Sequence, residues 1–162
     1  MSPEIAIFGG GCFWCTEAVY QQLKDVASVI PGYAGQPKAE VIRIEYDSTI
    51  ISYRDLLTVF FAVHDPTTLN RQGNDVGTQY RSIIFTTSPE QEQEAKAFIK
   101  EIDTPDSKIV TEVKPLEKFY EAEDYHRNYY QNNKDQPYCQ IVISPKLEKL
   151  KEKFYKLLNH EN

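Results

Sequence analysis

The chain has 162 residues, of which 41% are hydrophobic and 26% are charged, and its formal net charge is −6. We expect residues 1–162 to form one domain, because this length can bury a substantial core. The acidic balance and the lack of a lysine and arginine cluster argue against binding to nucleic acids or to a membrane surface. No apolar run approaches the roughly 18 residues of a membrane span. We therefore predict a monomeric, cytoplasmic protein.

The stretch from Ile5 to Glu17 is the most informative part of the chain. Ile5 to Phe8 is an apolar run typical of a strand, and three glycines follow it. The next positions share one helical stripe: Cys12, Cys15, Thr16, Val19, Tyr20 and Leu23. Cys12 would then lie in the first helical turn, where free N–H groups favour a negative charge. We expect a lowered pKa for this thiol and interpret Cys12 as a nucleophile.

Other interpretations of Cys12 and the glycines remain open. A half-buried cysteine on an amphipathic helix is often a packing residue only. Glycines between a strand and a helix also occur in phosphate-binding loops, although neither G-x-G-x-x-G nor a closing Gly-Lys-Ser/Thr is present. Three consecutive glycines weaken a fold unless the backbone must bend sharply or a ligand must come close. This favours the nucleophile.

The chain holds three cysteines, too few for a disulfide scaffold. In a reducing compartment, a C-x-x-C pair is more often redox-active or metal-binding than structural. A zinc site built from Cys12, Cys15, Cys139 and His64 or His126 fits no usual ligand spacing, so we expect no metal or other cofactor.

The remaining pattern alternates between strand and helix signals. We predict strands at 26–30, 40–47, 82–86, 109–113 and 138–143, with helices that begin at the caps Ser52 and Ser88, at 121–131 and near Leu147. A long polar stretch, 64–80, is typical of a functional or disordered loop. The order β-α-β-β-α-β through residue 86 predicts an α+β fold: a ferredoxin-like two-layer sandwich with a C-terminal extension.

Several motifs resemble the A class of peptide methionine sulfoxide reductases. They are Gly10-Gly11-Cys12-Phe13-Trp14, Gly32-Tyr33-Ala34-Gly35, the run from His64 to Ser82, Ala122-Glu123-Asp124-Tyr125-His126 and Pro137-Tyr138-Cys139-Gln140. The likeness runs nearly end to end. It implies reduction of methionine-(S)-sulfoxide, free or in proteins, to methionine, without a cofactor and with thioredoxin or a similar dithiol protein as reductant.

The resemblance also implies roles for individual residues. Cys12 would attack the sulfoxide sulfur and become a sulfenic acid. Glu40 would be the acid that protonates the sulfoxide oxygen, while Tyr80 and Asp75 would bind that oxygen and orient water. The residues that match the methyl pocket are Phe13 and Trp14.

Each of these polar residues also has a simpler interpretation. Glu40 resembles a solvated charge at a strand end, Asp75 a turn residue beside Gly73, and Tyr80 a core residue. His126 fits a core or capping role, and we assign it no catalytic part.

One departure from the family concerns the connection between Gly35 and Glu40. The family carries a much longer insertion there, which includes a second oxygen-binding tyrosine, whereas this chain has only Gln36 to Ala39. Either Tyr80 works with fewer partners or another tyrosine, such as Tyr33, replaces the missing one.

The sulfenic acid needs a second thiol to resolve it. Cys15 stands one helical turn from Cys12, so proximity favours it, although closing a disulfide over that turn adds strain. Cys139 matches a cysteine that other members carry and is the alternative. Rival functions for the same residues are a general C-x-x-C disulfide oxidoreductase and a cysteine hydrolase.

Overall fold

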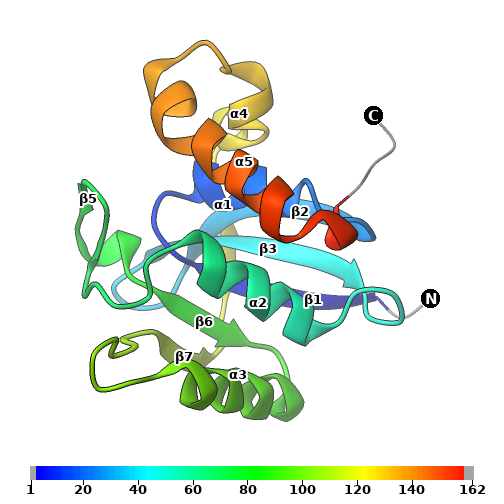
Figure 1. Cartoon of the computed structure of the whole chain (residues 1–162), viewed down its shortest axis with the longest axis vertical. Coiled ribbons are helices and arrows are strands. Elements are labelled where there is room, and N and C mark those ends of the chain that lie inside the picture. The colour runs from blue at the N-terminus through cyan, green and yellow to red at the C-terminus, as the bar shows by residue number, and fades with distance from the viewer. Residues whose placement is uncertain (1–2, 159–162) are drawn as a thin grey trace.

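The computed structural model describes residues 3–158, which contain a six-stranded sheet in the order β7-β6-β1-β3-β2-β8 (Figure 1). Its strands are β1 (Pro3–Gly9), β2 (Val26–Ala34), β3 (Ala39–Asp47), β6 (Ile83–Thr86), β7 (Glu112–Pro115) and β8 (Phe119–Glu121). β6 and β7 pair in parallel, and all other neighbours pair antiparallel. The protein therefore has a mixed α+β fold.

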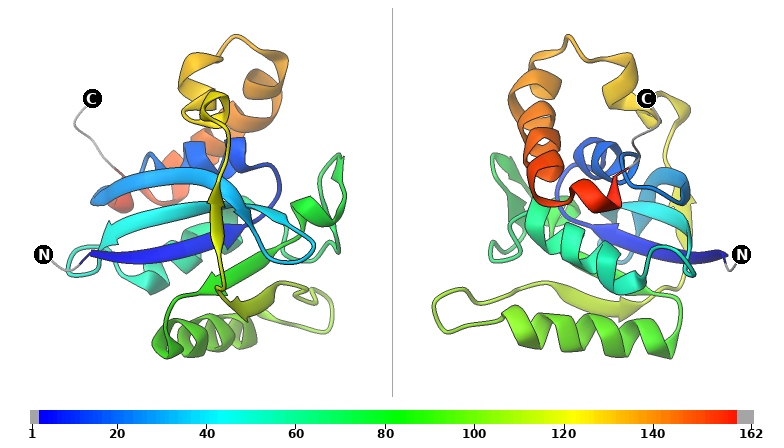
Figure 2. Two further views of the ribbon diagram at one scale, coloured as in Figure 1. Left: turned by 180° about the vertical axis from the view of Figure 1, so that it is seen from behind. Right: turned by 45° about the vertical axis from the view of Figure 1, so that its right-hand side comes forward.

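Helices cover one face of this sheet. α1 (Phe13–Tyr20), α2 (Tyr53–Val63) and α5 (Ser144–Lys153) lie over the strands, as the views from the front and from behind show (Figures 1 and 2). α3 (Pro89–Ile102) packs against α2, β6 and β7. The short elements are β4 (Arg71–Gln72), β5 (Asp75–Val76), α4 (Tyr129–Asn132), the 3₁₀ turns η1 (Thr78–Tyr80), η2 (Asp124–His126) and η4 (Tyr155–Leu157), and the π-helix η3 (Cys139–Ile143).

Alternation along the central strands divides the core between the two faces of the sheet. Phe8, Ile42 and Ile44 are fully buried beneath the helices. Ile7 and Val41 point the other way, into a smaller cluster on the opposite face. Because side chains alternate along a strand, both faces of β1 and β3 are apolar. The predicted strands at 5–8 and 40–47 are confirmed.

The predicted helix starts are also confirmed. The Ser52 hydroxyl accepts from the Asp55 N–H at 3.0 Å, and the Asp55 carboxylate accepts from the Ser52 N–H at 3.1 Å, which forms a capping box. Ser88 caps α3 through the Gln91 N–H at 3.2 Å. α1 begins directly after Cys12 as expected, but it is buried nearly all round and not along one stripe.

Other predictions were wrong in detail. Residues 138–143 were predicted as a strand, but Cys139–Ile143 form a π-helix. This helix buries Cys139 and Ile143 completely and leaves Ile141 73% exposed. The strand predicted at 109–113 lies at Glu112–Pro115. The helical segment expected at 121–131 is split into η2 and α4. Within residues 3–158, no helix is both long and apolar enough to cross a membrane.

Candidate active site

The glycine bend after β1 delivers Cys12 to the first position before α1. Gly11 has a φ of +92°, a conformation that glycine adopts without strain, and a Cβ there would lie 2.7 Å from Cγ of Gln72. Cys12 is the N-cap residue of α1, with an extended backbone. The sequence-based placement of this thiol at a helix start is therefore confirmed.

The backbone of α1 binds a carboxyl group from β3. The Phe13 N–H, in the first turn of the helix, donates to Oε1 of Glu40 at 3.1 Å. Strand packing is tight here, since a Cβ on Gly9 would approach the Glu40 carbonyl oxygen to 2.9 Å. The pKa of Glu40 is raised from 4.5 to about 7, chiefly by burial; the Phe13 hydrogen bond acts to lower it and the Asp75 charge to raise it. Glu40 can hold or release a proton near neutral pH.

The expected acidic shift of Cys12 was wrong in direction. The pKa of the Cys12 thiol is raised to about 12, chiefly by burial and also by the neighbouring Cys15 and Glu40. Hydrogen bonds from the Trp14 backbone and the Tyr138 hydroxyl lower it, but they do not offset the burial. The free protein holds Cys12 as a thiol because desolvation outweighs the helix terminus.

The long polar loop brings Asp75 and Tyr80 to the same place. Within this loop, β4 and β5 form a short hairpin in which Gln72 pairs with Asp75. Burial raises the pKa of Tyr80, and the charges of Glu40, Asp75 and Cys12 raise it further. The structure thus brings Cys12, Glu40, Asp75 and Tyr80 together as the sequence suggested.

A buried arginine fixes the segment that carries Tyr80. The Arg81 guanidinium donates to the Thr78 carbonyl at 2.8 Å and to the Pro37 carbonyl at 2.7 Å. It also pairs with Glu112 at 2.9 Å. These contacts tie η1 to the short β2–β3 connection and to β7.

Aromatic side chains form a wall beside Cys12. The Trp14 ring stacks on Tyr129 with 3.7 Å between ring centroids, and its Nε1–H donates to Nδ1 of His126 at 3.0 Å. The Phe13 ring lies 4.9 Å from the His126 ring and 5.5 Å from the Tyr33 ring. Tyr33 in turn donates to the Glu123 carboxylate at 3.3 Å. Phe13 and Trp14 therefore both belong to an aromatic cluster next to Cys12.

The two remaining cysteines lie on the α5 side of α1. Cys15 is 3% exposed, and its Sγ lies 3.2 Å from the Tyr138 hydroxyl. Cys139 is completely buried at the start of the π-helix. Burial and the nearby Cys15 raise the pKa of Cys139. Cys12 is the N-cap residue and Cys15 lies in the first turn of α1; the Cys15 N–H donates to the Cys12 carbonyl at 3.1 Å.

Sequence reasoning missed Tyr138, His126 and Arg81 as parts of this site. Tyr138 hydrogen-bonds to Asp75 as well as to Cys15, yet the alternating pattern around it suggested only a strand. A histidine can serve in many roles, so the residue type of His126 did not point to this site. Its hydrogen bond with Trp14 joins residues 112 positions apart, which no local pattern predicts. The available signals were the family-like motifs that contain Tyr138 and His126 and the position of Tyr138 next to Cys139 in the chain.

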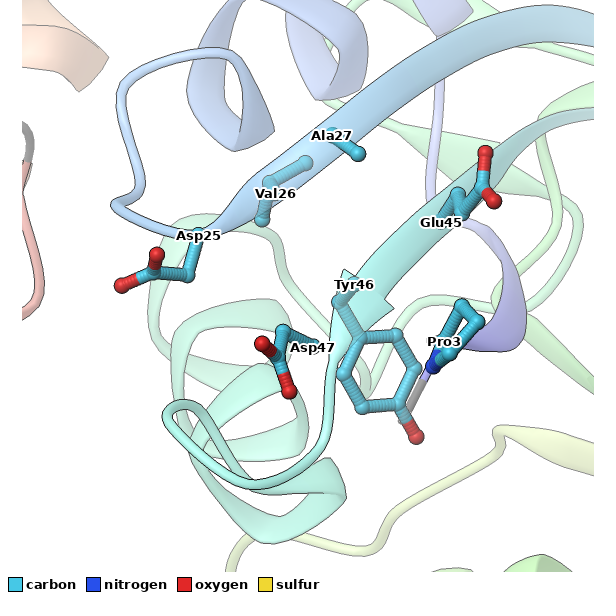
Figure 3. Close-up of a pocket in the computed structure, with 7 residues that line it drawn as sticks. All are labelled: Pro3, Asp25, Val26, Ala27, Glu45, Tyr46 and Asp47. Atoms are coloured by element: carbon cyan, nitrogen blue, oxygen red, sulfur yellow. The ribbon is translucent and has the colours of Figure 1, made fainter. Parts of the chain in front are cut away.

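The described residues contain no group of at least three histidine, cysteine or acidic side chains that could hold a metal ion. A cavity of about 260 Å³ lies between the start of β1 and the end of β3, at the opposite end of β1 from the glycine bend that carries Cys12 (Figure 3). Its lining includes Pro3, Asp25, Tyr46 and Asp47, and none of the predicted site residues.

Comparison with known proteins agrees with this arrangement. The profile described as "Peptide methionine sulfoxide reductase" matches residues 4–158. The chain is 53% identical to peptide methionine sulfoxide reductase MsrA of Saccharolobus solfataricus, over 93% of this chain and 94% of that protein. These findings define an oxidoreductase that acts on methionine sulfoxide. The chain belongs to the peptide methionine sulfoxide reductase family, in its A class.

Solved structures support the same assignment. The chain resembles reduced Mxr1 from Saccharomyces cerevisiae with a TM-score of 0.78 and 35% identity, covering 85% of this chain and 90% of that one. It also resembles Mxr1 in a complex with Trx2, with a TM-score of 0.61 and 34% identity, covering 79% of this chain and 85% of that one.

Proposed function

We propose that this reductase acts on the S epimer of methionine sulfoxide, free or in proteins, with Cys12 as nucleophile and Glu40 as acid. The observation that carries the proposal is the Phe13 N–H bond to Glu40, which holds a partly buried carboxyl group beside the Cys12 thiol. A nucleophile and an acid in one partly buried site are what sulfoxide reduction needs.

The chemical step joins one thiol and one sulfoxide. The Cys12 sulfur attacks the sulfoxide sulfur, the sulfoxide oxygen gains a proton, and the thiol loses one. The oxygen then passes to Cys12: a bond from Cys12 sulfur to oxygen forms while the bond from substrate sulfur to oxygen and the sulfur–sulfur bond of the adduct break. Methionine leaves, and Cys12 becomes a sulfenic acid. The proton count is unchanged overall, which makes the high pKa of free Cys12 compatible with attack.

Glu40 supplies the proton that the oxygen gains. Its pKa of about 7 lets the side chain donate near neutral pH. Tyr80 donates a hydrogen bond to the same oxygen, and Asp75 orients water. Tyr33 takes the place of the tyrosine that the short β2–β3 connection lacks; its support is the ring contact with Phe13 and the influence of the Glu40 charge on its pKa.

The aromatic wall binds the methyl group of the substrate. Phe13 and Trp14 offer apolar faces to a soft sulfur centre. The hydrogen bond from Trp14 to His126 and the stacking on Tyr129 support a fixed orientation of the indole. A fixed wall on one side of Cys12 accounts for selection of one sulfoxide epimer.

We assign the resolving role to Cys15 in preference to Cys139. Residues three apart on a helix have Cβ atoms about 5–6 Å apart, while a disulfide needs about 3.5–4.5 Å. Cys12 has extended backbone outside the helix, so only the N-cap must move to close this gap. Cys139 would have to leave a fully buried position.

Thioredoxin or a similar dithiol protein then reduces the disulfide. The likeness to Mxr1 in its complex with Trx2 supports this partner. A cytoplasmic location, a monomeric state and the absence of nucleic-acid or membrane partners stay predictions.

We also infer that the chain is a single catalytic domain built on a ferredoxin-like core. The antiparallel order β6-β1-β3-β2 supports this description, because these strands alternate with α1 and α2 along the chain. β7, β8 and the segment through α5 would be the C-terminal extension.

Cys12→Ser is expected to release no methionine from a peptide that contains methionine-(S)-sulfoxide, because a serine hydroxyl is a poor nucleophile toward sulfur. The measurement is methionine formed per protein in one turnover, with dithiothreitol as reductant. The natural protein should release methionine from the S epimer and none from the R epimer. Full turnover by Cys12→Ser would refute the assignment.

Methionine release should rise with pH up to about 7 and then level off. The reactive form carries one proton on the Cys12 and Glu40 pair, as thiolate and carboxylic acid. Below pH 7 both groups are protonated, so the rate falls about tenfold per pH unit. Glu40→Gln should lower the plateau by about 10²- to 10⁴-fold and let the rate keep rising toward the thiol pKa. A single-turnover pH profile of the natural protein and of Glu40→Gln checks both expected rates. An unchanged profile in Glu40→Gln would place the acid elsewhere.

Cys15→Ser should release one equivalent of methionine and then stop, with a dimedone-reactive sulfenic acid on Cys12. Cys139→Ala is the matched control and should turn over with thioredoxin like the natural protein. Disulfide mapping after one substrate equivalent should find a Cys12–Cys15 bond. Normal recycling by Cys15→Ser together with a Cys12–Cys139 bond would transfer the resolving role to Cys139.

A further inference from the structure

A chain of hydrogen bonds leads from the Cys15 thiol to a carboxylate. The Tyr138 hydroxyl donates to Oδ2 of Asp75 at 3.3 Å, and Sγ of Cys15 lies 3.2 Å from the same hydroxyl. A hydroxyl that gives its single proton to Asp75 still has lone pairs with which to accept the S–H of Cys15. The chain is therefore directed, from Cys15 through Tyr138 to Asp75.

We propose that Tyr138 is the proton relay of the resolving step, which accepts the proton of Cys15 while it passes its own proton to Asp75. The proposal rests on the assignment of Cys15 as the resolving thiol.

The step balances as follows. Cys15 Sγ forms a bond to Cys12 Sγ, and the S–O bond of the sulfenic acid breaks. Cys15 sulfur is oxidised, Cys12 sulfur is reduced, and hydroxide is the leaving group. The proton from Cys15 moves to Tyr138 as the Tyr138 proton moves to Asp75. The same path returns a proton to the hydroxide, which leaves as water.

The surroundings of the two side chains explain why a relay is needed. Cys15 is nearly inaccessible to water, and burial raises its pKa, so the reactive thiolate is scarce. Burial and the two nearby thiols hold the pKa of Tyr138 well above its usual range. Tyr138 thus stays protonated and conducts a proton without storing one. The Tyr138 hydroxyl is also among the groups that lower the pKa of Cys12, so it lies close to both reacting sulfur atoms.

The test compares two rates in one experiment. After rapid mixing with one equivalent of methionine sulfoxide peptide, methionine release and loss of dimedone-reactive sulfenic acid are followed separately. Tyr138→Phe should lower the ratio of the resolution rate to the release rate by about 100-fold, the lower end of what a positioned proton-transfer group contributes. In this variant the resolution rate should also rise with pH, because only ionised Cys15 can attack.

Tyr130→Phe is the matched control, since the Tyr130 hydroxyl pairs with the Ser144 hydroxyl at 2.9 Å. It should keep both rates. If Tyr138→Phe does not fold, Asp75→Asn, which removes the proton acceptor, should lower the same ratio. An unchanged ratio in a protein that forms the Cys12–Cys15 disulfide overturns the relay alone. A Cys12–Cys139 disulfide in the natural protein overturns the Cys15 assignment and the relay with it.

Discussion

The hydrogen bond from the Phe13 N–H to Glu40 is the constraint on which the site depends. It joins the start of α1 to β3 across 27 residues and holds a carboxyl group against the bend that carries Cys12. The glycines make this approach possible, because side chains at Gly9 or Gly11 would collide with the Glu40 carbonyl or with Gln72. Backbone geometry thus sets the distance between nucleophile and acid.

Burial, and not the helix terminus, has the largest influence on the protonation of Cys12 and Glu40. Desolvation raises the pKa of both Cys12 and Glu40, because burial disfavours the ionised form of each group. Reaction with a neutral sulfoxide requires one proton to leave sulfur and one to reach oxygen. A site that disfavours separated charge is suited to that exchange, because the charges arise and disappear within one partly buried space.

Much of the fold followed from local patterns in the sequence. The alternation at 40–47 and the caps at Ser52 and Ser88 depend on neighbouring residues only, and these predictions were confirmed. The segment at 138–143 did not follow, because it alternates like a strand and yet winds as a helix against α1, whereas the helix predicted near Leu147 is present as α5. The pKa of Cys12 was also mispredicted, because burial is a property of the whole fold. Contacts such as that between Trp14 and His126 join residues too distant for any local pattern to predict.

The most direct test of this account is a carboxyl ¹³C NMR titration of protein labelled at glutamate, with Glu40→Gln used to assign the Glu40 signal. The account predicts a midpoint near pH 7 for Glu40. A midpoint near the ordinary value of 4.5 would mean that the carboxyl group is solvated and ionised at neutral pH. It could not then act as the acid beside Cys12, and the account would be contradicted.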